Sequence, residues 1–348
     1  MLVAMADPVV SVLTPVYNGE RHLDECIQSV LRQTYRGWDY TILDNRSTDD
    51  TAAIAEGHAA KDARIRVVRA MEHLDVHGNH NRAVRAVHPR SRYVKIVHAD
   101  DWLYPECLER MVALADAHPS VGVVSAYRLE ERDVKHDGLY AYSQNVLSGR
   151  EVMREALLGT AWVTGSPTSL LFRSDRVQQP RDFFDSSVWH SDTDAAYRVM
   201  MNCDVGFVHQ VLTFTRVHPD ALTSSFSRRV NSYISHEGRM LVRYGPKILT
   251  PQEYRLKMRK WLARYAWYLG QQRSKLSRSK EGDFRDFHRQ EIRRMIDEIG
   301  QDRETRIVLS LWARLLLSPR SSLQSAVSRC PRAERANDGP LSQRTGCQ

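Results

Sequence analysis

Segments of two alternating kinds fill the first 130 residues of the chain. Apolar runs typical of β-strands, such as VVSVLTP (9–15) and YTILD (40–44), alternate with segments whose apolar residues recur at helical spacing. This alternation predicts an α/β fold with a mostly parallel, doubly wound sheet flanked by helices. Strands are expected within 8–18 and at 38–43, 65–70, 93–97 and 121–130, and helices at 20–34, 79–87 and 105–117.

The charge of the chain is unevenly distributed. Residues 1–226 contain 24 basic and 30 acidic residues, a net charge of −6, whereas residues 227–348 contain 26 and 12, a net charge of +14. A basic region of this kind predicts an anionic partner, either a membrane surface or nucleic acid. The expected parts are an α/β domain at 1–226, a basic helical extension at 227–318 and a disordered tail at 319–348.

The composition predicts a protein without a zinc cage, a disulfide framework or a membrane span. Its five cysteines lie far apart and form no CxxC pair, which is typical of a reducing cytosol. The first residues, MLVAMADP, lack the basic segment that opens a secretory signal. No run of about 18 apolar residues occurs. We therefore expect a cytoplasmic location, with peripheral attachment to the membrane through the basic region.

Polar and charged residues follow three of the expected strands, at the point where each strand ends. These segments are Thr14–Asn18, Asp44–Asp50 and His98–Asp101. Because the carboxyl ends of parallel strands lie at the same edge of a sheet, we expect the three segments to meet in one crevice. The pattern alone therefore predicts a ligand site at this edge.

Two adjacent acids, Asp100 and Asp101, follow the strand-like run YVKIV (93–97). Carboxylates at a strand end suit Mg²⁺ or Mn²⁺, which take hard oxygen ligands. The alternative is structural: Asp101 caps the helix expected from Pro105, or both acids lie in a solvated loop.

Asp44 directly follows the second expected strand. Its carboxylate can accept hydrogen bonds from a ribose hydroxyl or a base N–H. The residues behind it also fit a helix start, with Ser47 or Thr48 as the N-cap and acidic residues in the first turn. We expect both, with ligand binding by Asp44 and capping within 47–50.

Several motifs, in order, resemble the family 2 glycosyltransferases, which have the GT-A fold. They are VSVLTPVYNGERHLDECIQSVLRQTY (10–35), YTILDNRSTDDT (40–51), HGNHNRAVRAV (77–87) and HADD (98–101). The resemblance extends over residues 8–220 and implies a nucleotide-binding half at 8–130 and an acceptor-side half at 131–226. It further implies that the nucleotide of a nucleotide-sugar is bound by Thr14, Pro15, Tyr17, Asp44 and Asn81.

The HADD segment stands where the family usually has DxDD, the motif that binds the metal and the diphosphate. The resemblance implies that Asp100 contacts the nucleotide-sugar and holds a divalent cation, Mg²⁺ or Mn²⁺, and that Asp101 supports the diphosphate. His98 replaces the first acid and cannot supply its negative charge. We expect His98 to hydrogen-bond to the nucleotide rather than to bind the metal, since Mg²⁺ and Mn²⁺ sites rarely need nitrogen.

The segment SSVWHSDTDAAYRVM (186–200) resembles the part of the family in which an acidic pair opens a helix and supplies the catalytic base. Asp192 takes the base position, where a carboxylate can accept the proton of an acceptor hydroxyl. Helix-start capping is the structural alternative for Asp192. Asp194 and Arg198 are expected to form an i,i+4 ion pair. GSPTSLLFR (165–173) resembles the acceptor-side segment.

The segment TFTRVHPD (213–220) resembles the Arg-x-His strand end of the family. This resemblance implies that Arg216 contacts the diphosphate and that His218 is a weaker metal ligand; a surface loop is the structural alternative. Trp162 and Trp189 could stack on a sugar face, although aromatic side chains more often lie in a core.

Together these residues predict inverting transfer of a sugar from a nucleotide-diphosphate donor, a UDP-sugar, to a hydroxyl of a glycan or glycolipid, as in polysaccharide biosynthesis. One alternative is a sugar nucleotidyltransferase. Such an enzyme typically has a Gly-rich, basic loop after its first strand, whereas TPVYNGERHL (14–23) has one Gly and one Arg. The other alternative is a non-catalytic protein that binds a nucleotide or, through its basic region, nucleic acid. Nucleic acid is the less expected of these partners.

A helix expected at 254–270 carries Tyr254, Trp261 and Tyr265 on one face and several Arg and Lys residues elsewhere. This face either packs against the catalytic domain or lies in a membrane interface.

Overall fold

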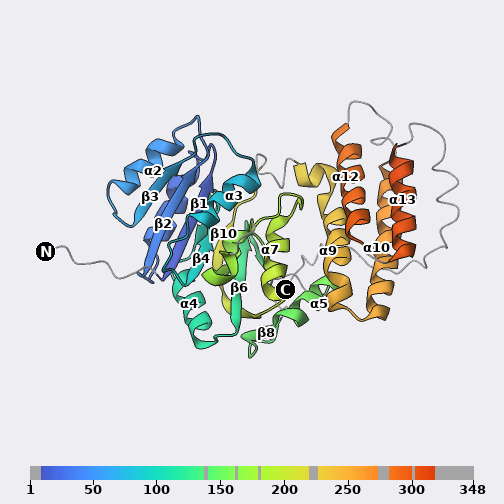
Figure 1. Ribbon diagram of the computed structural model, residues 1–348. Helices are drawn as coiled ribbons and strands as arrows, with labels where there is room; N and C mark the ends of the chain where they lie inside the picture. Colours follow the sequence, from blue (N-terminus) through green and yellow to red (C-terminus); the bar gives the residue numbers. More distant parts are fainter. Residues whose placement is uncertain are drawn as a thin grey trace, which may run out of the picture. The chain divides into compact units, whose positions relative to one another are not determined.

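The structure, a computed structural model, describes residues 9–136, 140–160, 164–178, 182–218, 226–272, 282–299 and 302–317. Two compact units are present (Figure 1), one of residues 1–228 with 247–249 and one of residues 229–246 with 250–348. Trp162 and the tail predicted at 319–348 lie outside the described residues. Among the described residues, no helix is long and apolar enough to cross a membrane.

The described part of the first unit is built on a ten-stranded sheet. Its order is β3-β2-β1-β4-β9-β6-β10-β5, with β7 beside β6 and β8 beside β10. The strands are β1 (Val10–Val16), β2 (Trp38–Asp44), β3 (Ile65–Arg69), β4 (Tyr93–Ile96), β5 (Trp102–Leu103), β6 (Val121–Glu130), β7 (Asp133–Lys135), β8 (Val146–Ser148), β9 (Leu171–Arg173) and β10 (Asp204–Thr215).

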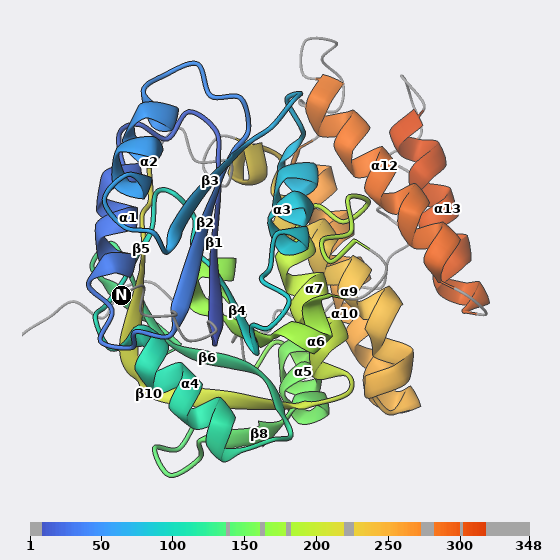
Figure 2. The same ribbon diagram turned by 60° about the vertical axis from the view of Figure 1, so that its left-hand side comes forward.

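Helices cover both faces of the parallel strands. α1 and α2 lie on one face of β1, β2 and β3, and α3 lies on the other (Figure 2), as a doubly wound fold requires. The helices of this unit are α1 (Leu23–Leu31), α2 (Thr51–Ala59), α3 (Val76–Arg85), α4 (Cys107–Ala117), α5 (Gly149–Leu158), the 3-10 helix η1 (Pro167–Ser169), α6 (Ser174–Val177) and α7 (Ser191–Met200).

The sheet is parallel throughout its first half and mixed in its second. β1 pairs in parallel with β2 and β4, and β2 pairs in parallel with β3. β9 lies antiparallel between β4 and β6, and β5, β7 and β8 are antiparallel neighbours of β10 or β6. These added strands have only two or three residues, too few for an alternating pattern to be read from the sequence.

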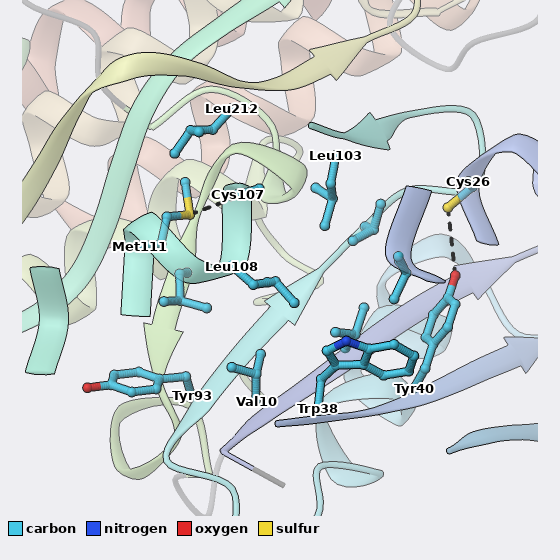
Figure 3. Close-up of a cluster of buried hydrophobic side chains, with 14 of the residues drawn as sticks. Val10, Cys26, Trp38, Tyr40, Tyr93, Leu103, Cys107, Leu108, Met111 and Leu212 are labelled. Carbon is cyan, nitrogen blue, oxygen red and sulfur yellow. Dashed lines mark hydrogen bonds between the residues drawn. The ribbon is translucent and has the colours of Figure 1, made fainter. Parts of the chain in front are cut away.

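The main core lies between the sheet and the helices α1 and α4 (Figure 3). Val10, Trp38, Tyr93, Leu108 and Met111 are all buried in it. Every residue of β1 is buried, which explains the continuous apolar run in its sequence.

The three polar strand ends meet at one edge of the sheet, as predicted. In the loop after β1, the Asn18 N–H donates to Ser47 Oγ over 2.9 Å, and Asn18 Oδ1 accepts from the Thr48 N–H over 2.9 Å. A Cβ added at Gly19 would lie 3.5 Å from the Cβ of Ala99, which follows β4. The loops after β1, β2 and β4 are therefore neighbours.

The N-cap of α2 is Asp50, within the predicted range 47–50, but it is neither Ser47 nor Thr48. Ser47 is used by the loop after β1, and α2 begins only at Thr51, whose N–H and hydroxyl both donate to Asp49 Oδ1. Asp101 does not cap α4, whose N-cap is Glu106. Asp101 at the end of β4 therefore has partners other than the start of α4.

The second unit is a set of packed helices. Trp261 in α10 donates its Nε1–H to the Ile234 carbonyl in α9 over 2.8 Å, and the Tyr265 ring lies 5.7 Å from the Trp312 ring in α13. The predicted aromatic face is therefore buried, and these partners lie in the helical unit itself. The helices in this part are α8 (Arg228–Val230), α9 (Ser232–Ile248), α10 (Pro251–Gln271), α12 (Gly282–Glu298) and α13 (Arg303–Leu317).

Acid is expected to destabilise the helical unit through the buried His288. Its Nδ1 lies 2.6 Å from the Tyr265 hydroxyl and its Nε2 lies 2.8 Å from the Val230 carbonyl oxygen. Burial lowers the pKa of His288 from 6.5 to about 4, so the unfolded chain binds this proton before the folded chain does.

The unfolding free energy should therefore fall as the pH is lowered from 6.5 towards 4, by up to ~3 kcal/mol. Urea denaturation at a series of pH values measures this slope. His288→Gln should flatten it, and a slope that is the same in both proteins would contradict the assignment.

Candidate active site

A buried carboxylate, Asp101, ties together three segments beyond the end of β4. Its oxygens accept hydrogen bonds from the Thr168 hydroxyl over 2.7 Å and from the Arg216 backbone N–H over 3.0 Å. Thr168 belongs to η1, and Arg216 follows β10. The second half of the sheet is thereby connected to the HADD loop.

Asp100, beside it, is half-buried and lies among groups that can carry positive charge. His218 Nε2 lies 3.0 Å from Asp100 Oδ2, and Arg216 Nε donates to the Asp100 carbonyl over 3.1 Å. The other end of the Arg216 guanidinium donates to Glu25 Oε2 in α1 over 2.5 Å. The structure therefore places the predicted residues Arg216 and His218 together with Asp100.

The residues of the HADD loop fit a divalent cation. Ligand atoms of His98, Asp100 and Asp101 all lie within 4.8 Å of one another. Burial and the neighbouring charge of Asp100 raise the pKa of Asp101 to about 6. Two ionised carboxylates are therefore costly here without a counter-charge, and a cation with a preference for oxygen ligands would supply one.

The fold places a second histidine, His80, next to His98. His98 Nε2 lies 3.1 Å from Nε2 of His80 in α3, and His80 Nδ1 lies 2.8 Å from the Val76 carbonyl oxygen. Burial lowers the pKa of His80 to about 3, so this side chain is neutral. The His98 backbone N–H donates to the Thr168 hydroxyl over 3.1 Å.

Asp44 is fully buried at the end of β2. Its Oδ1 accepts from the Ser47 N–H over 3.0 Å, and its Oδ2 lies 3.2 Å from Nε of Arg69 in β3. The Asp44 carbonyl accepts from Arg82 in α3 over 2.9 Å. Its predicted contact with a ribose or base stays a prediction.

Of the residues predicted to bind nucleotide at the end of β1, Tyr17 is the exposed one. The Thr14 hydroxyl is buried and lies 2.8 Å from the Tyr40 hydroxyl. Pro15 is also buried. The Tyr17 ring lies edge-on to His73 at 4.5 Å between centroids, and the predicted nucleotide contacts of Thr14, Pro15 and Tyr17 stay predictions.

Asn81 holds the loop that leads into α7. Its Nδ2 donates to the Phe184 carbonyl and its Oδ1 accepts from the Phe184 N–H, each over 2.8 Å. His77 Nε2, in the same helix, lies 3.2 Å from the Val188 carbonyl oxygen. Because both polar groups of the Asn81 side chain are used in this way, its observed role is to position the loop; the predicted nucleotide contact stays a prediction.

Asp192 lies in the first turn of α7 and is half-buried. A negative residue is favoured in this position by the helix dipole, and its side chain is not the N-cap. Asp194 is buried and lies 3.2 Å from Arg198 Nε, which confirms the predicted ion pair. Trp189 donates its indole N–H to Ser227 over 2.9 Å, a structural contact.

Comparisons with known proteins agree with this arrangement. The family described as glycosyl transferase family 2 matches residues 11–176. This match supports a family 2 glycosyltransferase. A relative described as an uncharacterized glycosyltransferase, RP339 of Rickettsia prowazekii, is 24% identical over 226 residues, which are 65% of this chain and 69% of that protein.

Solved structures share the fold of this chain. S. aureus TarS 1-349 in complex with UDP-GlcNAc superposes with a TM-score of 0.57 at 15% identity, over 88% of this chain and 87% of that chain. The mannosyltransferase PcManGT from Pyrobaculum calidifontis, in complex with GDP-Man and Mn²⁺, has a TM-score of 0.55 at 17% identity, over 90% and 81%. The predicted GT-A-type fold is thereby confirmed.

Several site residues of this glycosyltransferase were missed by the sequence analysis: Glu25, Arg69, His80 and Thr168. His80 stands in HGNHNRAVRAV and Thr168 in GSPTSLLFR, two segments that the family resemblance does single out. Which residue of such a segment faces the site depends on the rotation of α3 and on the pairing of β9 with β4. Neither is readable from spacing.

Proposed function

We propose that this glycosyltransferase moves a sugar, with inversion, from a nucleotide-diphosphate donor to a hydroxyl of a glycan or glycolipid in polysaccharide biosynthesis. The observation that carries the proposal is the cluster of Asp100 and Asp101 with Arg216 and His218 at the carboxyl ends of the strands. A UDP-sugar is the proposed donor, supported by the shared fold of TarS, which is named in complex with UDP-GlcNAc.

The leaving diphosphate needs positive charge opposite it. When bound by Asp100, with His218 as a weaker ligand, a divalent cation would neutralise charge on the diphosphate. Arg216 would add a fixed positive charge, because Glu25 and the Asp100 carbonyl hold its guanidinium in place. Asp101 would position Arg216 through its backbone N–H.

The acceptor hydroxyl must lose a proton as its oxygen attacks the anomeric carbon. The Asp192 carboxylate is proposed to take this proton, so that attack occurs on the face opposite the diphosphate and the configuration inverts. The loop before it is held by α3 through Asn81. The same helix supplies His80, which contacts His98. Helix α3 therefore links the HADD loop to the loop that precedes Asp192.

The nucleotide is proposed to lie over the ends of β1 and β2. Tyr17 is exposed there and offers an aromatic ring for the base. Asp44 would accept hydrogen bonds from the ribose or base, with Arg69 moving away from one carboxylate oxygen.

Heat denaturation with different ligands tests the donor. UDP with Mn²⁺ at about 100 times its Kd should stabilise the folded protein by about 2.7 kcal/mol and raise Tm, whereas GDP and dTDP should raise it less. Incubation with UDP-sugars should then release UDP and not pyrophosphate. Pyrophosphate release would indicate a nucleotidyltransferase instead, and a Tm shift with RNA that vanishes in salt would indicate nucleic-acid binding.

We further propose that the helical unit binds an anionic membrane surface through the outer face of α10, at the cytoplasmic side. Leu256 and Trp267 are exposed on this helix, together with Arg255, Arg259 and Lys260. These three cations have no carboxylate partner among the described residues. Exposed aromatic and basic side chains on one helix suit a membrane interface, and such a surface would bring the enzyme to a lipid-linked acceptor.

Charge reversal of this face should abolish membrane binding. Each Lys or Arg near an anionic surface contributes about 1 kcal/mol, so the triple variant R255E/R259E/K260E should bind at least ~100-fold more weakly. Co-sedimentation with phosphatidylserine-containing vesicles measures this, and high salt should release the wild-type protein. R132E, in the first unit, is the control. Absence of wild-type binding at low salt would contradict the proposal.

A further inference from the structure

The HADD loop has a histidine where its family has a carboxylate, and the structure shows what that histidine contacts. We propose that His98 is a nitrogen ligand of the divalent cation, and that His80 selects the His98 tautomer that makes this possible. The inference rests on the proposed function, because it concerns the cation that would stabilise the leaving diphosphate. It replaces the predicted hydrogen bond between His98 and the nucleotide.

The hydrogen bonds of His80 determine which of its nitrogens carries a proton. A carbonyl oxygen can only accept, so His80 Nδ1, which lies 2.8 Å from the Val76 carbonyl oxygen, carries hydrogen and donates it. A neutral imidazole has one N–H, and the half-buried His80 ring lies 5.4 Å from the Phe184 ring. His80 Nε2 is therefore an acceptor.

The same reasoning then applies to His98. Its Nε2 lies 3.1 Å from this acceptor, so His98 Nε2 carries hydrogen and donates it to His80. The lone pair of the neutral His98 ring is consequently on Nδ1. A metal-binding histidine commonly donates its second ring nitrogen to a hydrogen-bond acceptor, which orients the ring and fixes the tautomer. Here the acceptor is another imidazole.

The position of His98 agrees with a ligand. A ring nitrogen of His98 and carboxylate oxygens of Asp100 and Asp101 lie within 4.8 Å of one another. The His98 backbone is fixed by its N–H bond to Thr168, and the Thr168 hydroxyl in turn donates to Asp101. One hydroxyl thus holds two of the three members of the group in place.

A donor set of one imidazole and two carboxylates changes the preferred metal. Mg²⁺ takes oxygen ligands almost exclusively. Mn²⁺ also prefers oxygen but, as a transition metal, accepts an imidazole beside carboxylates, and Co²⁺ binds an imidazole more strongly than Mn²⁺ does. We therefore expect this enzyme to favour Mn²⁺ or Co²⁺ over Mg²⁺, and we expect His98→Asp to shift the preference towards Mg²⁺, on the order of 10-fold.

Pulsed electron paramagnetic resonance of bound Mn²⁺ tests the assignment directly. The 348-residue chain, without a purification tag and in a buffer free of amines, is loaded with Mn²⁺ and UDP. Coupling of Mn²⁺ to ¹⁴N is expected in the wild type, in His22→Gln and in His218→Gln, which removes the weaker ligand, and its loss is expected in the double variant His98→Asp/His218→Gln. Bound Mn²⁺ without ¹⁴N coupling would overturn the proposal, as would coupling that survives in His98→Asp and disappears in His218→Gln.

Two substitutions of His80 separate its positioning role from simple packing. His80→Leu removes the acceptor and should weaken Mn²⁺ binding about 10–100-fold, with weaker ¹⁴N coupling. His80→Gln keeps an acceptor oxygen for His98 and should restore most of the affinity; equal affinity in all three proteins would overturn the tautomer argument. Sugar transfer is assayed on the same samples, so wild-type transfer without ¹⁴N coupling refutes this inference alone, whereas absence of transfer with every donor refutes the proposed function.

Discussion

Asp192→Asn is expected to lower kcat for sugar transfer by about 10²–10⁴-fold, the usual contribution of a general base. The amide keeps the size of the carboxylate and cannot accept the proton of the acceptor hydroxyl. Because Asp192 lies in α7 and not at the ends of β1 and β2, UDP should bind the variant as it binds the wild type. Isothermal titration with UDP and Mn²⁺, beside a transfer assay, measures both quantities.

Asp194→Asn is the matched control, two residues further along α7. Asp194 is buried and paired with Arg198, so its replacement should lower the unfolding free energy rather than kcat of the protein that remains folded. A fully active Asp192→Asn variant would refute the catalytic assignment. Loss of UDP binding in that variant would place Asp192 in the donor site instead.

Trp261→Ala is expected to lower the unfolding free energy of the helical unit by about 3–5 kcal/mol, as for other buried aromatic side chains. Trp261 is 1% exposed and lies so close to α9 that a Cβ added at Gly238 would clash with its ring. Truncation would open a cavity between α9 and α10 and leave the Ile234 carbonyl without its indole partner. Urea denaturation followed by circular dichroism measures the loss, with the two units allowed separate transitions.

Trp267→Ala is the matched control, since it removes the same side chain from the same helix. Trp267 is 67% exposed, and its truncation should change stability by no more than about 0.5 kcal/mol. Trp261→Phe keeps most of the volume but loses the hydrogen bond to Ile234, so a loss of about 1–3 kcal/mol is expected. Similar losses for Trp261→Ala and Trp267→Ala would contradict the packing described here.

The first half of the fold was predictable because its elements are long and buried. Strands such as β1 and β2 have seven residues each, and their apolar runs alternate with helices that cover both faces. The meeting of the loops after β1, β2 and β4 followed from parallel pairing alone. Helix starts were less predictable: α10 begins at Pro251, before the expected 254, because Thr250 and Glu253 form a capping box.

The sequence by itself determined the family resemblance, the strand-end acids and the aromatic face of α10. These features depend on residues that are near one another in the chain, or on a repeat that local geometry imposes. The tertiary structure alone decided which side chains complete the site. Thr168 and Arg216 reach Asp101 from 67 and 115 residues away, and such contacts depend on strand order, which has no local signal.

His98 illustrates the division between the two. The sequence shows that a histidine replaces the acid of the motif, but the histidine alone leaves its tautomer and its partners undetermined. The packing of α3 against the sheet brings His80 to 3.1 Å from it, and a hydrogen bond inside α3 then determines which nitrogen of His98 is free. A proton's position is set by the nearest acceptor, and here the fold, not the chain order, supplies that acceptor.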